Sequence, residues 1–125
     1  GDMVRGVLEG IAFELRESME IYQSMTELPL REARVFGGGA ASPVWCDILS
    51  QVFDLPLTAY SCPEIANYGA ARLAYIGAEG RDGLGSGVLG QTVRYTPSQE
   101  TAALYRTLYA RYKEQEAAIL LPGQG

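Results

Sequence analysis

Three consecutive glycines, Gly37 to Gly39, lie in the stretch RVFGGGAASPVWCDILSQVF, which spans residues 34–53. The residues before them are typical of a short strand, and Ser42 followed by Pro43 is typical of a helix start. A glycine turn that leads into a helix leaves backbone N–H groups free to bind an anion such as phosphate. Glycine also lets a ligand approach the backbone closely, because it has no Cβ. A sharp turn with no ligand uses glycine as well, so both interpretations stay open.

The sequence contains no histidine, and this removes several kinds of chemistry. Catalytic Ser-His and Cys-His pairs and His-containing metal sites are excluded within this chain. The two cysteines, Cys46 and Cys62, are too few for a zinc site or a disulfide framework. We expect both to be reduced packing residues, as free cysteines commonly are. The sequence therefore predicts no metal site.

A literal Gly-x-Gly-x-x-Gly pattern occurs at Gly85, Gly87 and Gly90. The context argues against dinucleotide binding, because no strand is predicted before the pattern and no helix directly after it. We interpret it as part of a flexible loop over residues 77–91. The turn at Gly37 is not a Walker A loop either, since no Lys-Ser or Lys-Thr pair follows its glycines.

Two acidic pairs, Glu14 with Glu17 and Glu114 with Glu116, are candidates for acid–base catalysis because carboxylates can transfer protons. They fall on the polar faces of predicted helices, so we interpret them as solvated surface. Asp47 falls one turn into the helix after the glycines. A carboxylate there is favourable through its charge near the helix N-terminus, by a few tenths of a kcal/mol.

Helical periodicity dominates both ends of the chain. The first predicted helix covers residues 3–25 and contains Gly6 and Gly10, which we expect to mark close packing against a neighbour. The last predicted helix opens at a capping box over residues 96–99, with Pro97 at its first position. We expect an aromatic stripe on this helix to dock onto the body of the domain. The stripe consists of Tyr105, Leu108, Tyr109 and Tyr112.

The middle of the chain predicts two short strands, over residues 33–36 and 57–60, separated by a helix that ends at Asp54. Strand–helix–strand order is typical of a parallel α/β layer. Two short strands make only a small sheet, and parallel strands normally lie in larger sheets with both faces covered. The pattern therefore indicates part of a domain.

A further helix is predicted over residues 64–77. Ser61 and Glu64 have the spacing of a capping box at its start. The small residues Gly69–Ala71 give this helix a face on which another element is expected to pack closely.

Composition narrows the classes of partner. The 125-residue chain carries a net charge of −5, which argues against nucleic acid, because phosphate binding needs a basic patch. No apolar run reaches membrane-spanning length, and no charged and then apolar leader opens the sequence. We expect a cytoplasmic protein that binds neither nucleic acid nor membrane.

Four blocks of the sequence resemble successive blocks of the FGGY carbohydrate kinases. The blocks are VRGVLEGIAFELR, VFGGGAASPVWCDILSQVFDLPL, EIANYGAARLA and YTPSQETAALYRTLYARY. The resemblance is closest to the xylulokinase branch. It implies a helix-rich α/β fold with a small parallel sheet, part of an actin-like ATPase (ribonuclease-H-like) domain. Residues 1–125 would then be the C-terminal portion of the family's second domain.

The resemblance also implies a function, the ATP-dependent transfer of the γ-phosphate, with Mg²⁺, to a hydroxyl of a carbohydrate. A ketopentose such as xylulose is the expected substrate. The residues that it assigns to the nucleotide are the backbone of Gly37, Gly38 and Gly39, with Ala40 at the edge and Ser42 facing adenine. Three positions depart from the family's pattern, namely Ala41, Asp47 and Gln51. A charge contact is absent at the first, and the contributions of the other two stay open.

In this family the sugar site, the catalytic base and the main phosphate loop belong to a first domain, which this sequence does not contain. We therefore expect no catalytic residue in the chain and no kinase activity from the chain alone. The expected partners are ATP or ADP, and a sugar held by the other domain. We also expect self-association through a bared sheet edge and apolar helix faces. The alternative function is a non-catalytic, actin-like interaction module.

Overall fold

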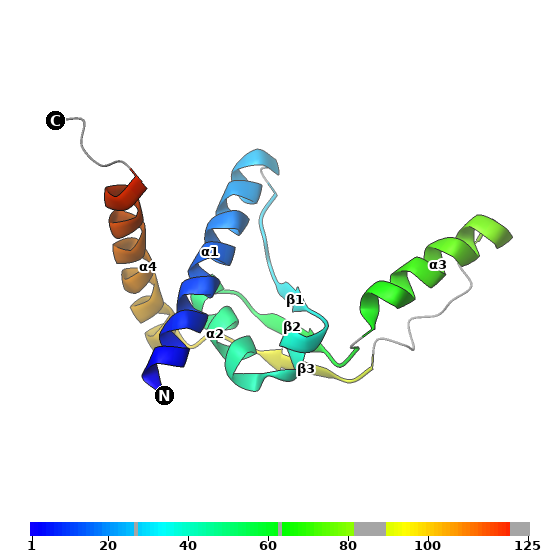
Figure 1. The fold of residues 1–125 in the computed structure, drawn as a ribbon, viewed down its shortest axis with the longest axis horizontal. Helices are drawn as coiled ribbons and strands as arrows, with labels where there is room; N and C mark the ends of the chain where they lie inside the picture. Colours follow the sequence, from blue (N-terminus) through cyan, green and yellow to red (C-terminus); the bar gives the residue numbers. More distant parts are fainter. Residues whose placement is uncertain (27, 63, 82–89, 121–125) are drawn as a thin grey trace.

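The computed structural model describes residues 1–26, 28–62, 64–81 and 90–120. Its elements follow one another as α1 (Asp2–Thr26), β1 (Ala33–Val35), the 3₁₀ helix η1 (Gly38–Ala41), α2 (Pro43–Phe53), β2 (Leu57–Tyr60), α3 (Ile65–Glu79), β3 (Thr92–Tyr95) and α4 (Gln99–Leu120). Figure 1 shows a three-stranded sheet at the centre, with α1, α2 and α4 gathered at one side and α3 projecting away from the other end. The molecule therefore has one packed body and one extended arm.

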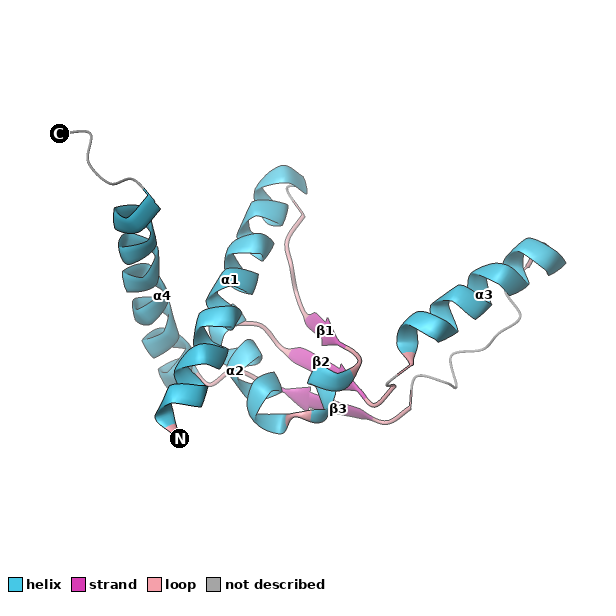
Figure 2. Ribbon diagram, viewed as in Figure 1, coloured by secondary structure: helices cyan, strands magenta, loops and turns pink. Residues whose placement is uncertain are grey.

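The sheet has the order β1-β2-β3 and mixes the two strand directions (Figure 2). The two strands predicted from the sequence pair in parallel, with Ala33 opposite Leu57. β3 was not expected, and it pairs with β2 in the antiparallel direction, with Thr92 opposite Tyr60. Three of the four residues of β3 are exposed, so its sequence carries no clear alternation of apolar and polar positions. The sheet is thus mixed rather than wholly parallel.

α2 is the centre of the core. Ile48 and Val52 of α2 are fully buried, and Leu57 of β2 is fully buried beneath them. α2 contacts α1 and α4 on one side and the sheet on the other. Six consecutive or nearly consecutive residues of α2 are buried, from Cys46 to Val52 except Asp47, so the helix reads as a largely apolar segment, and its predicted extent is confirmed.

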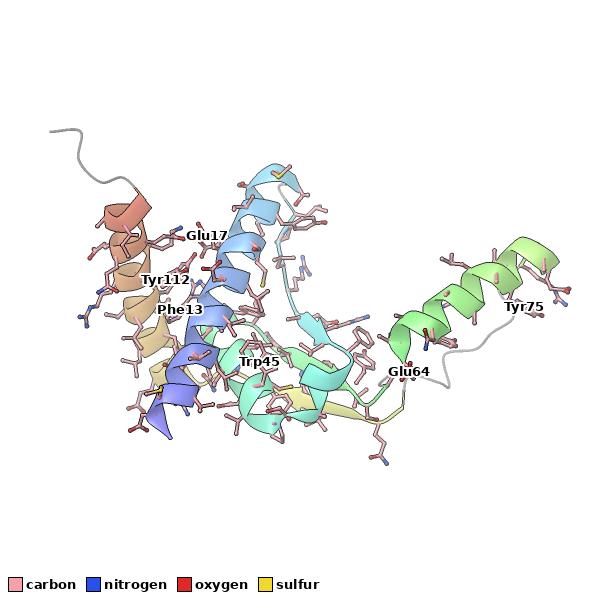
Figure 3. The ribbon with its side chains drawn as sticks, viewed as in Figure 1. Phe13, Glu17, Trp45, Glu64, Tyr75 and Tyr112 are labelled. Atoms are coloured by element: carbon pink, nitrogen blue, oxygen red, sulfur yellow. The ribbon has the colours of Figure 1, made fainter. Side chains whose placement is uncertain are left out.

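α4 docks onto α1 through the predicted aromatic stripe (Figure 3). The ring of Phe13 lies 6.3 Å from that of Tyr105, 5.7 Å from that of Tyr109 and 5.4 Å from that of Tyr112. The guanidinium carbon of Arg16 also lies 4.5 Å from the centre of the Tyr109 ring. These contacts fill the space between two helices that are far apart in the sequence.

The helix starts match the predictions in one case and differ in two. The Ser42 hydroxyl accepts a hydrogen bond from the Trp45 amide at 3.3 Å, as the predicted cap requires. The last helix begins at Gln99, two residues later than its predicted start would place it, because Ser98 Oγ accepts from the Thr101 amide at 3.2 Å. Ser61 does not cap α3, since its hydroxyl oxygen accepts from the Gln91 amide at 2.9 Å instead.

Two predictions of close packing are wrong. A Cβ added at Gly6 or Gly10 of α1 would meet nothing within 4 Å, and both glycines border a hollow of about 300 Å³ beside α4. A Cβ added at Gly69 of α3 would likewise meet nothing, and no residue of α3 is buried. Within the described ranges, these small residues do not bring another element close.

The side of the body that faces β1 is apolar and uncovered. β1 forms one end of the sheet, so its outer edge has no partner strand among the described residues. An apolar groove of about 610 Å³ runs beside it, lined among others by Leu15 of α1, Val35 of β1 and Phe53 of α2. α1 continues this surface with exposed apolar side chains, which are Met3, Val4, Val7, Ile11, Ile21, Tyr22 and Met25.

Candidate functional site

The glycine turn begins where β1 ends. Gly37 has φ 74° and ψ −158°, a backbone conformation open to glycine and strained for any other residue. One 3₁₀ turn follows, in which the Ala40 amide donates to the Gly37 carbonyl at 3.1 Å and the Ser42 amide donates to the Gly39 carbonyl at 3.2 Å. The residues from Gly37 to Ala41 therefore connect the end of β1 to the start of α2.

The three glycines face different surroundings. A Cβ added at Gly37 or Gly38 would meet nothing within 4 Å, so the backbone is bare at these two positions. A Cβ added at Gly39 would lie 3.3 Å from Nε1 of Trp45. Gly39 allows tight packing, as one interpretation of the sequence requires, and Gly37 and Gly38 leave the backbone accessible. Ligand contact at these two residues stays a prediction.

A hollow of about 240 Å³ lies against the bare side of the turn. Its lining residues are Gly37, Gly38, Ala40, Ala41, Tyr60, Ser61 and Cys62. They come from the carboxyl ends of β1 and β2, which run in parallel. In open α/β sheets, ligands bind in the crevice beyond the carboxyl ends of parallel strands. The hollow has the position of a ligand site.

The predicted site residues divide into two groups. Gly37, Gly38 and Ala40 line the hollow together. Gly39 lies against Trp45, and Ser42 uses its hydroxyl oxygen to cap α2, so neither is among the lining residues. Sequence reasoning missed Tyr60 and Ser61 as lining residues. The sequence of a short strand does not indicate that its last residues will lie beside the glycine turn.

Cys46 supports the turn from below. Its side chain is fully buried, with Sγ 3.7 Å from the carbonyl oxygen of Gly39 and 3.8 Å from that of Ala40. Burial raises the pKa of the Cys46 thiol, which therefore stays protonated and able to donate to these oxygens. Cys62 is also buried, and both cysteines are free. The prediction of reduced packing cysteines is confirmed.

Asp47 and Gln51 take part in a polar link rather than in the hollow. Gln51 is buried, with its Oε1 accepting from the Ser98 amide at 3.0 Å and its Nε2 donating to Asp47 Oδ1 at 3.3 Å. This link connects α2 to the start of α4. Both the oxygen and the nitrogen of this buried side-chain amide therefore have a hydrogen-bond partner.

The sequence predicted that Glu14 and Glu17 of α1 are solvated, but in the structure both bond to side chains of α4. Glu14 accepts a hydrogen bond from the Tyr112 hydroxyl at 2.7 Å, and Glu17 forms an ion pair with Lys113. Glu116 also pairs with Lys113, at 2.8 Å. The bonds of Glu14 and Glu17 tie α1 to α4, over 80 residues apart in the chain, whereas the Glu116–Lys113 pair lies within α4. Sequence periodicity carries no information on pairs between distant helices.

Within the described ranges, no group of three or more His, Cys, Asp and Glu side chains is placed to hold a metal ion. In that part of the chain, no helix has the length and apolar character needed to cross a bilayer.

The family model for the C-terminal domain of the FGGY family of carbohydrate kinases matches residues 1–78, a segment that includes the glycine turn and the hollow. The chain belongs to the FGGY family. The resemblance read from the sequence is thereby confirmed, and the bare turn lies inside the matched segment.

Individual relatives agree with this assignment. A gluconokinase from Bacillus subtilis is 30% identical over 111 residues, covering 85% of this chain and 21% of the relative. A glycerol kinase from Citrifermentans bemidjiense is 34% identical over 76 residues, covering 61% of this chain and 15% of the relative. The crystal structure of a xylulose kinase from Rhodospirillum rubrum superposes with a TM-score of 0.78 at 28% identity, covering 95% of this chain and 25% of that one.

Two conclusions follow from these FGGY relatives. The predicted fold class, a helix-rich α/β part of an actin-like ATPase domain, is confirmed, with the sheet mixed as described above. The chain spans only about a fifth of the length of the curated relatives that it matches.

The described part of the Gly-x-Gly-x-x-Gly pattern does not have the context of a dinucleotide turn. Gly85 and Gly87 lie outside the described residues, and Gly90 is followed by strand β3 rather than by a helix. A dinucleotide turn requires a strand before the glycines and a helix after them. Gly90 has φ +68°, and a Cβ there would lie 2.6 Å from Ser61 Oγ. Its role is a close backbone contact.

Proposed function

We propose that this chain is the nucleotide-side portion, residues 1–125, of the C-terminal domain of an ATP-dependent carbohydrate kinase. The complete enzyme would transfer the γ-phosphate of ATP to a hydroxyl of a sugar. Membership of the FGGY family supports the reaction class. The observation that carries the assignment of the nucleotide to this chain is the bare backbone of Gly37 and Gly38 beside a hollow at the carboxyl end of the sheet.

The geometry suits one part of a nucleotide. At about 240 Å³, the hollow is smaller than the roughly 300–1,000 Å³ that usually encloses a whole small-molecule ligand. Gly37 and Gly38 would offer backbone to the ligand, Ala40 would line its edge, and Ser42 would keep the turn in place through its cap of α2. ATP would supply the phosphoryl group.

Mg²⁺ would arrive with the phosphates of ATP. The described part of the chain has no carboxylate cluster for a metal, so the metal contacts in this proposal come from the phosphates and from the rest of the kinase. We place the enzyme in the cytoplasm, where ATP is available to it.

The proposed sugar is a ketopentose such as xylulose. The support comes from relatives named as xylulose kinases, including the solved one from Rhodospirillum rubrum. Other relatives are named gluconokinase and glycerol kinase. The choice of sugar is tested by comparing phosphorylation of xylulose, ribulose, gluconate and glycerol by the polypeptide that contains this chain together with its first domain.

The chain alone is proposed to be inactive. Phosphoryl transfer depends on positioning and charge neutralisation from both sides of the transferred group. The chain corresponds to 25% of the solved xylulose kinase, and it would provide one side only. A coupled assay of ADP release should detect no sugar-dependent turnover by the purified 125 residues.

Nucleotide binding is tested directly with the ¹⁵N-labelled chain and ADP. We expect ADP to shift the amide resonances of residues 37–42 and of Tyr60. Gly38→Phe should weaken binding at least about tenfold, because a Cβ at Gly38 meets nothing within 4 Å and the added ring would cover backbone that lines the hollow. Gly77→Phe on α3 is the matched control, since a Cβ at Gly77 also meets nothing within 4 Å. Absence of ADP binding, or equal binding by both variants, would favour the alternative of a non-catalytic interaction module.

A further inference from the structure

One aromatic residue, Tyr60, lines the hollow beside the glycine turn. Tyr60 is the last residue of β2 and lines the hollow together with Gly37 and Gly38. It is half-buried, and β2 directs it to the opposite face of the sheet from Leu57 and Ala59, which enter the core. The lining therefore combines bare backbone with one aromatic residue.

The ring of Tyr60 is held in place. It stacks on the ring of Phe36, with the centroids 4.6 Å apart and the planes 16° from parallel. Phe36 directly precedes the turn, so this stack joins the ends of β1 and β2. The next residue, Ser61, is fixed to Gln91 by two bonds of 2.9 Å, one from its amide and one to its hydroxyl oxygen. A ring anchored in this way loses little freedom when a ligand packs against it.

The chemistry of the lining favours a flat, uncharged group. Among the described residues that line the hollow, none carries a charge: they are two glycines, two alanines, one serine, one cysteine and one tyrosine. Phosphate groups bind to convergent N–H groups or cations, whereas a base has apolar faces that stack on aromatic rings. The uncharged lining with its one aromatic residue therefore fits a base.

We infer that Tyr60 is the stacking platform for the nucleobase, and that it determines affinity for the base rather than for the phosphates. The inference rests on the proposed function and adds a contact residue to it. Phe36 acts through Tyr60 and is a positioning residue. Base–aromatic stacking tolerates every base, so Tyr60 contributes to the binding of adenine and guanine nucleotides alike.

The test compares ADP and GDP with inorganic tripolyphosphate, which carries phosphates and no base, as ligands of the 125-residue chain. Tyr60→Ala should weaken the binding of ADP and of GDP about tenfold, the size expected for the loss of one base–aromatic stack. Tyr60→Phe should bind both nucleotides as the unchanged chain does, because the ring is kept. Tripolyphosphate affinity should be the same in all three proteins. Tyr22→Ala, at an exposed ring on α1, is the control.

The outcomes separate the two proposals. If Gly38→Phe abolishes ADP binding while Tyr60→Ala leaves it within about twofold, the proposed function stands and the platform is refuted. If Tyr60→Ala weakens tripolyphosphate as much as ADP, Tyr60 acts on the turn rather than on the base, and the inference also fails. If the unchanged chain binds no ADP at millimolar concentration, both proposals fall. Amide spectra of each variant show whether it is folded, and Tyr60→Leu replaces Tyr60→Ala if the smaller side chain disturbs the fold.

Discussion

The backbone of Gly90 lies so close to Ser61 that a Cβ added to Gly90 would stand 2.6 Å from the serine hydroxyl oxygen and 2.7 Å from its carbonyl oxygen. Ser61 lines the hollow, and Gly90 enters the strand that pairs with β2. The contact therefore holds the chain just before β3 against the residue after β2, beside the candidate site.

Gly90→Ala is expected to destabilise the chain. The new Cβ meets backbone as well as the hydroxyl, and φ at this position is +68°, which costs a non-glycine residue about 1–2 kcal/mol before any steric overlap. Urea unfolding followed by circular dichroism measures the change. Ser61→Ala removes one acceptor and relieves only part of the overlap, so it should not rescue Gly90→Ala. An unchanged unfolding midpoint would mean that the contact is not formed.

Gly10→Ala is expected to have the opposite effect. Gly10 lies inside α1, where a Cβ would meet nothing within 4 Å. Replacing glycine by alanine in a helix interior gains about 1 kcal/mol of helix propensity. The free energy of unfolding should rise by that amount, and Gly6→Ala should do the same. A loss of stability would show that another element packs against this face of α1 in solution.

The tyrosine–carboxylate bonds between α4 and α1 predict a loss of stability at alkaline pH. Burial, with a bond to Glu20, raises the pKa of Tyr109 to about 12, and a bond to Glu14, with burial, raises that of Tyr112 to about 12. Each ring is harder to ionise in the folded chain than in the unfolded one, where its pKa is about 10. The stabilisation is therefore complete below pH 10 and is lost as the pH rises from about 10 through 12.

Unfolding by urea, measured from pH 8 to pH 12, tests this dependence. Tyr112→Phe removes one hydroxyl donor, at a cost of about 1 kcal/mol at pH 8, and should flatten the alkaline slope. Tyr75→Phe on α3, far from this cluster (Figure 3), is the control and should leave the slope unchanged. Equal slopes in all three proteins would contradict the prediction.

Self-association is expected through the uncovered side of β1 and α1. Among the described residues the outer edge of β1 has no partner strand, and an apolar groove lies beside it. Folded proteins normally cover sheet edges and apolar surfaces of this kind. Sedimentation velocity should show mass increasing with concentration. Leu15→Glu, which places a charge in the groove, should shift the distribution toward monomer, whereas Ala110→Glu, at an exposed position of α4, should not. A monomer at all concentrations would refute the expectation.

Local signals in the sequence were sufficient for most of the elements. The apolar spacing around Ile48 and Val52 predicted α2, and Ser42 with Pro43 predicted its start, because both depend on neighbours within one or two helical turns. The glycine turn was also recognised as a candidate site from local residues. The bareness of Gly37 and Gly38 agrees with that prediction, and their contact with nucleotide stays a prediction.

The features that sequence reasoning missed all depend on distant residues. β3 exists because it pairs with β2, and its own four residues are too exposed to show a pattern. Ser61 was assigned to the cap of α3, but its hydroxyl is taken by Gln91, 30 positions away. The same holds for Tyr60, which reaches the glycine turn only because β1 and β2 end side by side.

The exposure of α3 has a consequence for how the chain unfolds. No side chain of this 15-residue helix is buried, so α3 gains little stability from core packing, and helices of that length are marginal in water without such packing. Its amide hydrogens should exchange with solvent orders of magnitude faster than those of α2, through local opening that leaves the body intact. Heating should therefore melt the arm first and the body in a separate, cooperative step, so that a single transition temperature does not describe the whole chain.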